Sequence, residues 1–472
     1  MTLSRRSFLR YGQAAGLFYS TIALGGLTAV TPSAQRPTSL TTDPAGLLDL
    51  PDGFAYSVVS RTGDAMADGF FRPGRPDGMA CFADPTSADR CILMRNHEIW
   101  PDTTHGSPFG ANNALLDRVP DGRLYGLKPD GSPFYGGVSK VVYDMRAGQL
   151  VEDYLVLIGT SANCAGGRTP WGSWLTCEES MRKPPEESQR YHGFVFETPS
   201  SANGLIEPVP LTAMGRFVHE AVAVDPDTGI IYLTEDSRTG LFYRFLPDTP
   251  GELHRGGKLQ ALAIREWPSA VTSNWPRDWG GAGLGMIEQG RSFAVDWIDL
   301  DNVESTDADL PDRGYAAGAA RFYRGEGMDY GVRPDGSGGD IFFTCTQGGV
   351  QRAGQVWKYS PSVSEGQSGE AADPGTLTLV YESPGADALD MCDNIAVAPW
   401  GDLILCEDGQ NENYLRGLTP SGQIYDFARN AHADKSEFCG ACFSPDGQIM
   451  FVNIQEPGIT LAVTGPWETL RA

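Results

Sequence analysis

The chain has 472 residues, with 36 lysines and arginines against 60 aspartates and glutamates, and its formal net charge at pH 7 is −24. This charge excludes nucleic acid and anionic membrane surfaces as favourable partners. It also repels a negatively charged substrate, unless bound multivalent cations invert the field at the site that takes it.

Residues 1–34 have the features of a twin-arginine export signal. Arg5 and Arg6 precede a glycine-rich, moderately apolar stretch over residues 14–30, and small residues follow near Ala34. A short membrane anchor is the alternative, but the stretch is weakly hydrophobic and short for a span of about 20 residues. We therefore expect a periplasmic or secreted protein that uses the twin-arginine machinery and has no stable membrane association.

The remainder, residues 35–472, is expected to form one domain. Strand-like apolar runs dominate from Phe54 onward, helical periodicity is scarce, and no Ser/Gly linker or charge run divides the chain. Hairpin turns built on proline and glycine recur at residues 224–229, 397–402 and 443–448. A hairpin unit that recurs along the chain is typical of a β-propeller with insertions.

Five apolar strands run directly into polar and acidic residues. These strand ends lie at residues 93–98, 174–179, 232–236, 404–408 and 452–456. Because the inner strands of all propeller blades surround one axis, we expect acids from distant parts of the sequence to meet there. Like charges that are brought together raise one another's pKa and cost stability unless cations neutralise them. The pattern therefore predicts metal ions held by oxygen ligands.

The candidate ligands at these strand ends are Glu98, Glu178, Glu179, Glu235, Glu407 and Asp408. The thiolate of Cys177, which directly precedes Glu178, can join oxygen ligands around a metal softer than calcium, such as iron. A buried small hydrophobic residue is the alternative for this cysteine. A slip of one residue exchanges the inward and outward side chains of a strand, so Glu178 against Glu179, and Glu407 against Asp408, stay open.

Three segments resemble a known family. They are residues 163–179 (NCAGGRTPWGSWLTCEE), 215–221 (GRFVHEA) and 324–328 (RGEGM). Together they closely resemble the PhoX family of bacterial alkaline phosphatases, and the resemblance extends from about Phe54 to the carboxy terminus. It implies an all-β, six-bladed propeller that acts as a monomer. It also implies that the protein hydrolyses small phosphate monoesters outside the cytoplasm, with two Fe³⁺ ions and two or three Ca²⁺ ions.

The resemblance also implies roles for particular residues. The residues expected to hold the metal cluster are Cys177, Glu178, Glu220, Glu326 and a member of the pair Glu407 and Asp408. The phosphate-binding arginine is expected at Arg324, and further substrate contacts at Asn96 and Thr169. The residues alone support part of this: Arg324 lies two positions before Glu326, on the same side of an extended strand, where a guanidinium can bind phosphate bidentately. A surface ion pair is the alternative for Arg324.

Two other functions stay open at this point. A calcium-dependent propeller lactonase or esterase needs a carboxylate site and a divalent ion, but neither the thiolate of Cys177 nor the guanidinium of Arg324. A non-catalytic binding propeller stabilised by metals leaves the concentration of acids at the strand ends unexplained. Metal content and phosphatase activity discriminate among the three functions.

Overall fold

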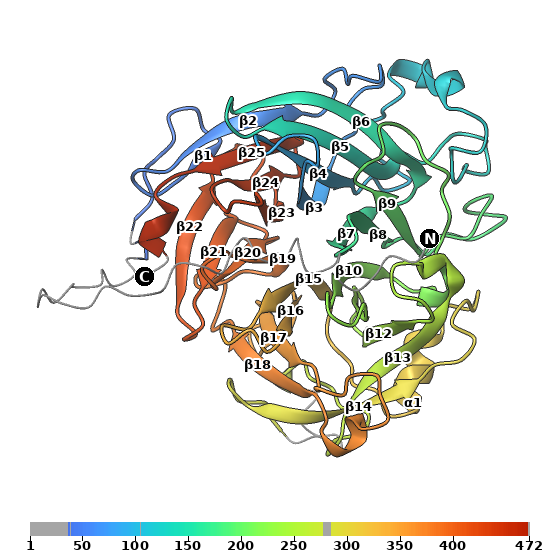
Figure 1. The fold of residues 1–472 in the computed structure, drawn as a ribbon, viewed down its shortest axis with the longest axis vertical. Helices are drawn as coiled ribbons and strands as arrows, with labels where there is room; N and C mark the ends of the chain where they lie inside the picture. Colours follow the sequence, from blue (N-terminus) through green and yellow to red (C-terminus); the bar gives the residue numbers. More distant parts are fainter. Residues whose placement is uncertain (1–35, 38, 104, 277–284, 471–472) are drawn as a thin grey trace, which may run out of the picture.

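The computed structural model describes residues 36–37, 39–103, 105–276 and 285–470, and the export signal predicted at residues 1–34 lies outside them. The chain forms antiparallel sheets that are arranged radially around a central axis (Figure 1). This all-β, propeller-like architecture confirms the prediction of the fold at the level of its class.

The strands form five sheets. One sheet contains, in spatial order, β3 (Pro76–Ala83), β4 (Arg90–His97), β5 (Gly136–Asp144) and β6 (Gln149–Thr160). The next contains β7 (Asn163–Arg168), β8 (Ser173–Glu178) and β9 (Val195–Pro199). The largest contains β10 (His219–Val224), β11 (Ile231–Glu235), β12 (Phe242–Pro247), β13 (Gly257–Ile264), β14 (Ser292–Asp299), β18 (Thr376–Glu382), β17 (Gln355–Ser360), β16 (Gly339–Cys345) and β15 (Gly325–Val332).

Two further sheets complete the ring. One contains β1 (Leu48–Asp49), β22 (Ile424–Asn430), β21 (Tyr414–Leu418), β20 (Leu403–Glu407) and β19 (Cys392–Val397). The other contains β2 (Ala55–Arg61), β25 (Ile459–Thr464), β24 (Met450–Ile454) and β23 (Phe438–Phe443). The helices are short: α1 (Leu310–Ala316) and the 3₁₀ helices η2 (Ala111–Asn113), η3 (Leu116–Arg118), η4 (Thr212–Met214), η5 (Leu253–Arg255), η7 (Glu370–Ala372) and η8 (Trp467–Leu470).

The largest sheet differs from the separate blades that the sequence suggests. Strands β10 to β13 pair in sequence order, and so do strands β15 to β18. Strand β14 joins the two sets because it pairs with β13 along one edge and with β18 along the other. Nine strands are therefore hydrogen-bonded into one continuous sheet.

The innermost strands contact one another in a closed ring around the axis. Moving around this ring, β3, β7, β10, β15, β19 and β23 each contact the next, and β23 contacts β3 (Figure 1). Strand β2, from the N-terminal part of the described chain, pairs with β25 near its C-terminal end. The last sheet thus joins a strand from near the start of the described chain to strands from near its end and closes the ring.

Each innermost strand is bulged near its first residue. The pairing register shifts after Pro76, Asn163, His219, Gly325, Cys392 and Cys439. A β-bulge bends its strand and re-aims a side chain, and bulges are common next to active sites. The residue that directly follows each of these positions is the bulge residue of its strand. The bulge residues are Asp77, Cys164, Glu220, Glu326, Asp393 and Gly440.

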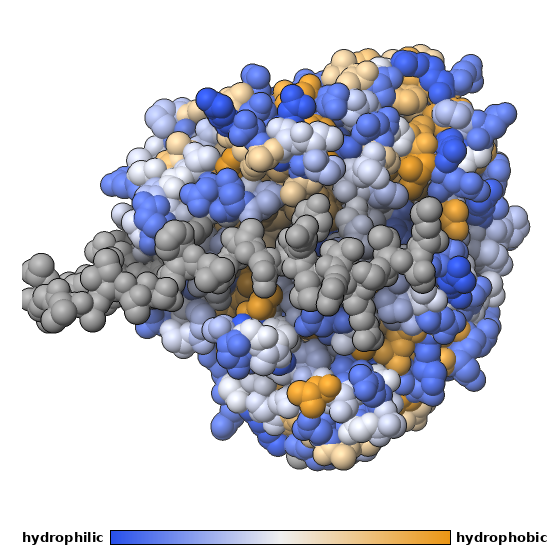
Figure 2. Space-filling view, in the orientation of Figure 1, coloured by the Kyte–Doolittle hydropathy of each residue, from blue (hydrophilic) through white to orange (hydrophobic). Residues whose placement is uncertain are grey.

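The hydrophobic core packs aromatic and aliphatic side chains within and between the sheets that surround this ring. The rings of Phe242 and Phe343 pack with centroids 4.6 Å apart, and Trp467 stacks on Trp400 and Phe427 at 5.4 and 5.5 Å. The end face of the ring that Figure 2 shows is mostly hydrophilic where it is coloured, with scattered hydrophobic side chains. No helix in the part of the chain that the structure describes is long and apolar enough to cross a membrane.

Candidate metal centre

Acidic side chains from around the ring meet at one end of the innermost strands. Two positions supply most of them: the bulge residue of the innermost strand, and the residue that directly follows the second strand of the same hairpin. Antiparallel pairing places these positions side by side, as where Asn163 pairs with Glu178 and Cys392 pairs with Glu407. The residues in the second position are Glu98 after β4, Glu179 after β8, Asp236 after β11 and Asp408 after β20.

Three groups of side chains bring their ligand atoms within 4.8 Å of one another. They are Cys164, Glu179 and Glu220; Glu220, Glu326 and Asp393; and Asp393, Asp408 and Glu437. Because Glu220 and Asp393 each belong to two groups, the three groups form one continuous cluster, which we call the axial cluster. Glu437 directly precedes β23, whose bulge position holds Gly440 in place of an acid.

The electrostatics of the axial cluster are those of a cation site. Burial raises the pKa of Glu220 well above its usual value, and the charges of Glu326 and Asp393 raise it further. Burial likewise raises the pKa of Asp393 to about 6 and that of Asp408 to about 7. Carboxylates in such surroundings cannot all ionise unless cations lie between them.

The donor atoms of the axial cluster fit two kinds of cation. Carboxylate oxygens are the ligands that hard ions such as calcium prefer, whereas a thiolate favours a softer metal such as iron. The thiol of Cys164 is buried, and burial raises its pKa, so that only a nearby cation would make it a thiolate at neutral pH. The mixed donor set therefore fits iron at the Cys164 end and calcium at the all-oxygen end.

Arg324 borders the cluster and is held there by two carboxylates. Its Nε and Nη2 donate to the two oxygens of Asp236 at 2.8 and 2.9 Å, and Nη2 lies 2.6 Å from Oε1 of Glu326. The charge of Glu326 is the main reason that the pKa of Arg324 is raised. Its Nη1 makes no hydrogen bond to any residue that the structure describes, and about a quarter of the side chain is exposed. The guanidinium therefore keeps one amino group available for an anion.

Glu98 and Asp77 extend the acidic region beyond the three groups. Oε2 of Glu98 accepts hydrogen bonds from Arg75 Nη2 at 3.0 Å and from Gln455 Nε2 at 2.8 Å. The same Gln455 nitrogen donates to Oδ2 of Asp77 at 2.9 Å. Oδ1 of Asp77 is buried and has no hydrogen-bond partner among the described residues. Burial, followed by the charge of Glu98, raises the pKa of Asp77 well above its usual value.

Cys177 belongs to none of the three ligand groups of the axial cluster. Its side chain is fully buried in an apolar cluster with Leu175, Val195 and Met214. Burial alone raises the pKa of its thiol. The cysteine that lies among the acids is Cys164, on the neighbouring strand β7.

Glu178, Glu235 and Glu407 form hydrogen bonds away from the axis. Glu235 accepts from Leu241 N at 3.1 Å and from the Tyr243 hydroxyl at 2.6 Å. Glu407 is paired with Arg416 at 2.7 Å, and the contacts of Glu178 are described below. In each strand the next residue, Glu179, Asp236 or Asp408, is the one that turns towards the axis. In both pairs that the sequence leaves open, residues 178–179 and 407–408, the second acid belongs to the axial cluster.

The structure places Asn96 and Thr169 in the scaffold. Nδ2 of Asn96 donates to the carbonyl oxygens of Cys164 at 3.0 Å and Ala165 at 2.6 Å, and its Oδ1 accepts from Trp174 Nε1 at 2.7 Å. The Thr169 hydroxyl lies 2.8 Å from the Ser173 hydroxyl in the turn between β7 and β8. Asn96 therefore holds the backbone of the β7 bulge, and Thr169 holds the turn that follows β7.

Of the residues in the axial cluster, the sequence prediction does not include Cys164, Asp393 or Glu437. A signal for the bulge positions exists, because a small residue follows most of them: Gly78 follows Asp77, Ala165 follows Cys164, Ala221 follows Glu220 and Gly327 follows Glu326. The neighbouring innermost strand explains this preference. A Cβ atom at Gly78 would lie 2.6 Å from the Cα of Ala165, and one at Gly327 would lie 2.6 Å from the Cα of Asn394.

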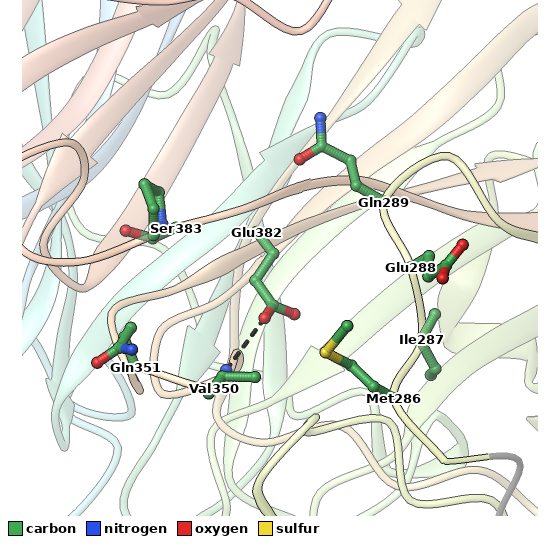
Figure 3. Close-up of a pocket in the computed structure, with 9 residues that line it drawn as sticks. Met286, Ile287, Glu288, Gln289, Val350, Gln351, Glu382 and Ser383 are labelled. Atoms are coloured by element: carbon green, nitrogen blue, oxygen red, sulfur yellow. Dashed lines mark hydrogen bonds between the residues drawn. The ribbon is translucent and has the colours of Figure 1, made fainter.

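A separate pocket of about 360 Å³ lies between residues 286–289, 350–351 and 382–384 (Figure 3). Both carboxylate oxygens of Glu382 are already used there. One accepts from Val350 N at 3.1 Å, and the other accepts from Asn274 Nδ2 and Gln355 Nε2 at 2.6 and 2.9 Å. The Glu382 carboxylate is therefore fully engaged, and the pocket shares no residue with the axial cluster.

The fold and the site together define a class of protein, a propeller-like protein with a buried acidic cluster of the kind that binds metal ions. The profile described as alkaline phosphatase PhoX matches residues 35–117 and 144–458, and the chain belongs to this family. It is accordingly an alkaline phosphatase, a hydrolase of phosphate monoesters, as the sequence predicts. No match is found among curated proteins.

One solved structure supports this fold. The chain resembles Pseudomonas fluorescens PhoX in complex with vanadate, a transition state analogue, with a TM-score of 0.64 and 18% identity over 91% of this chain and 97% of that chain. It also matches XC5397 from Xanthomonas campestris, a gluconolactonase, with a TM-score of 0.37 and 12% identity over 92% of this chain and 99% of that chain. The first likeness supports the fold, and the second is too low to bear on fold or function.

Proposed function

We propose that this alkaline phosphatase hydrolyses its esters at the axial cluster, with iron and calcium ions bound there. The observation that carries the proposal is the overlap of three ligand groups through Glu220 and Asp393, which would bring neighbouring cations to one substrate. The residues that would hold iron are Cys164, Glu179 and Glu220, and those that would hold calcium are Asp393, Asp408 and Glu437. The expected composition is two Fe³⁺ ions and two or three Ca²⁺ ions.

The bound cations would supply charge stabilisation for the phosphoryl oxygens and activation of the attacking oxygen. The chain's own part is to grip and orient the ester. Asp236 and Glu326 fix the plane of the Arg324 guanidinium, and its free Nη1 would bind a phosphoryl oxygen. Small phosphate esters are the proposed substrates, because the cations and Arg324 offset the net charge of −24 at this one place.

Export and assembly complete the proposal. Residues 1–34 would direct the folded protein through the twin-arginine pathway, leaving residues 35–472 as a single monomeric domain in the periplasm or outside the cell. Counting strands β10–β13 and β15–β18 as two blades gives six blades around the axis. The bulge that recurs in each innermost strand supports this count. Fractionation of cells with an Arg5→Lys, Arg6→Lys variant, which should stay in the cytoplasm, tests the export route.

The test of the catalytic proposal measures metals and activity on one sample. Iron and calcium in the purified mature protein are determined by mass spectrometry, and hydrolysis of a chromogenic phosphate monoester is followed at alkaline pH. We expect both metals, loss of activity on chelation, and recovery when the ions are returned. Calcium alone with no phosphatase activity would favour a lactonase or a binding propeller instead.

A further inference from the structure

Behind the axial cluster lies a buried set of Ser188, His192 and Glu178. Nδ1 of His192 is 2.6 Å from Oε1 of Glu178, and its Nε2 is 3.0 Å from the Ser188 hydroxyl. All three side chains are fully buried. The imidazole packs edge-on against the rings of Tyr125 and Phe134, with centroids 5.3 and 4.7 Å away. This packing gives His192 one defined orientation.

The order serine, histidine, carboxylate is also that of a nucleophilic triad. A nucleophile must reach its substrate, however, and Ser188 has no exposed surface. Its oxygen also accepts a hydrogen bond from Arg190 N at 3.1 Å, which ties the hydroxyl to its own loop. The three residues therefore have a structural role and do not form a nucleophilic triad.

Glu178 connects the two chain segments that carry the first ligand group. Its Oε1 also accepts from Ser161 N at 3.0 Å, in the turn that precedes Cys164, and Glu179 follows it directly in the sequence. The backbone N of Glu179 in turn donates to the Ala162 oxygen at 2.9 Å. Ala162 has φ = 50°, a left-handed conformation that a non-glycine residue adopts only when its surroundings hold it.

The other oxygen of Glu178 is also occupied. Oε2 accepts from Gly193 N at 3.0 Å and from Phe194 N at 3.3 Å, so neither oxygen is left to bind a cation. Arg216 anchors the same loop, because its Nε donates to the His192 carbonyl at 2.8 Å. The loop that carries Ser188 and His192 is thus held by its hydrogen bonds to Glu178 and by the hydrogen bond from Arg216.

We propose that Glu178, held by His192, is a positioning residue that fixes Cys164 and Glu179 for iron binding and is not itself a ligand. The inference rests on the proposed function of the axial cluster. Partners that orient metal ligands from behind typically contribute about 10- to 100-fold to metal affinity. His192 therefore affects the metal indirectly, through Glu178 and then through Cys164 or Glu179.

The test uses the full-length exported protein with His192→Gln and Glu178→Gln. The control is Glu365→Gln, because Glu365 is an equally buried, hydrogen-bonded carboxylate whose partners are Arg244, Tyr359 and Tyr232, outside the axial cluster. We measure iron affinity by titration of the metal-free proteins, and backbone hydrogen exchange in peptides that cover residues 160–164 and 178–180. We expect about 10- to 100-fold weaker iron binding and faster exchange in both test variants, and wild-type values in the control.

Wild-type iron affinity together with wild-type exchange in His192→Gln and Glu178→Gln would overturn the positioning role. If both variants fail to fold, Ser188→Ala removes only the hydroxyl that meets Nε2 of His192. Faster exchange at residues 160–164 in that variant supports the proposal, and unchanged exchange contradicts it. A wild-type protein that binds no iron would refute the proposed function instead, while the exchange data would still report on the Glu178 contacts.

Discussion

Arg324 is the residue of the proposed site that would connect the buried cluster to a soluble substrate. Its backbone has φ = 53°, and its carbonyl accepts from Thr346 N at 3.0 Å, which ties this unusual conformation to the neighbouring strand end. Asp236 and Glu326 hold two of its nitrogens, so the side chain loses little freedom when it meets an anion. Preorganisation of this kind is what makes a donor effective for a charged transition state.

We predict that Arg324→Ala lowers kcat/KM for a phosphate monoester by about 100- to 1000-fold, the usual effect of losing a preorganised donor. Arg324→Lys should keep part of the activity, because a lysine keeps the charge but not the fork of donors. The control is Arg333→Lys, since Arg333 pairs with Asp340 at 2.8 Å outside the axial cluster. Steady-state kinetics at alkaline pH decide, and an Arg324→Ala enzyme with wild-type kcat/KM would remove Arg324 from the site.

At the scale of strands, two acids that are adjacent in the sequence have different structural roles. Glu407 ends β20, is fully buried and pairs with Arg416 at 2.7 Å, whereas Asp408, directly after the strand, belongs to the axial cluster. The same division separates Glu178 from Glu179. Side chains alternate along an extended chain, so the first acid of each pair stabilises its own sheet and the second reaches the axis.

This division predicts opposite effects for two adjacent substitutions. Glu407→Gln should destabilise the metal-free protein by about 1–3 kcal/mol, because it removes the buried one of the two counter-charges of Arg416 and leaves only the half-exposed Asp426. Asp408→Asn should leave the stability of the metal-free protein unchanged or raise it, because it removes one of several crowded negative charges, but it should lower the calcium content. Urea unfolding and metal analysis of both variants test this. The reverse pattern would mean that the two carboxylates had been assigned the wrong way round.

The strand ends could be predicted from the sequence because an apolar run that stops at an acid is a local signal. The sequence could not show which of two adjacent acids faces the axis, because the bulges in the neighbouring innermost strands set the pairing register. Cys177 drew attention because it ends a clear apolar strand. Cys164 lies in β7, a segment rich in glycine with no apolar alternation, and only the ring of innermost strands brings it to the acids. Asn96 is expected as a substrate contact only from the family resemblance, but its amide supports the β7 backbone.

At the scale of the whole molecule, cations should decide how stability depends on pH. In the metal-free protein the pKa of Asp393 is about 6 and that of Asp408 about 7, both raised by burial, against about 3.9 for aspartate in an unfolded chain. Between about pH 4 and pH 7 the folded protein therefore binds more protons than the unfolded chain, and the free energy of unfolding falls as pH rises.

We accordingly predict that the melting temperature of the chelated protein decreases from pH 5 to pH 8. With iron and calcium bound, the same carboxylates are ionised in the folded state at lower pH, so stability should be lost on going to acid. Thermal unfolding of both forms across this range tests the sign. Parallel curves for the two forms would mean that the cations do not bind at these carboxylates.

The location of iron tests the account most directly. Crystals of the purified protein, measured with X-rays on either side of the iron absorption edge, give a map in which only iron produces a difference peak. We predict a peak within bonding distance of the Cys164 sulfur and of carboxylate oxygens from Glu179 and Glu220. A peak at Cys177, or no iron peak in an active enzyme, would contradict the assignment of the axial cluster as the catalytic metal centre.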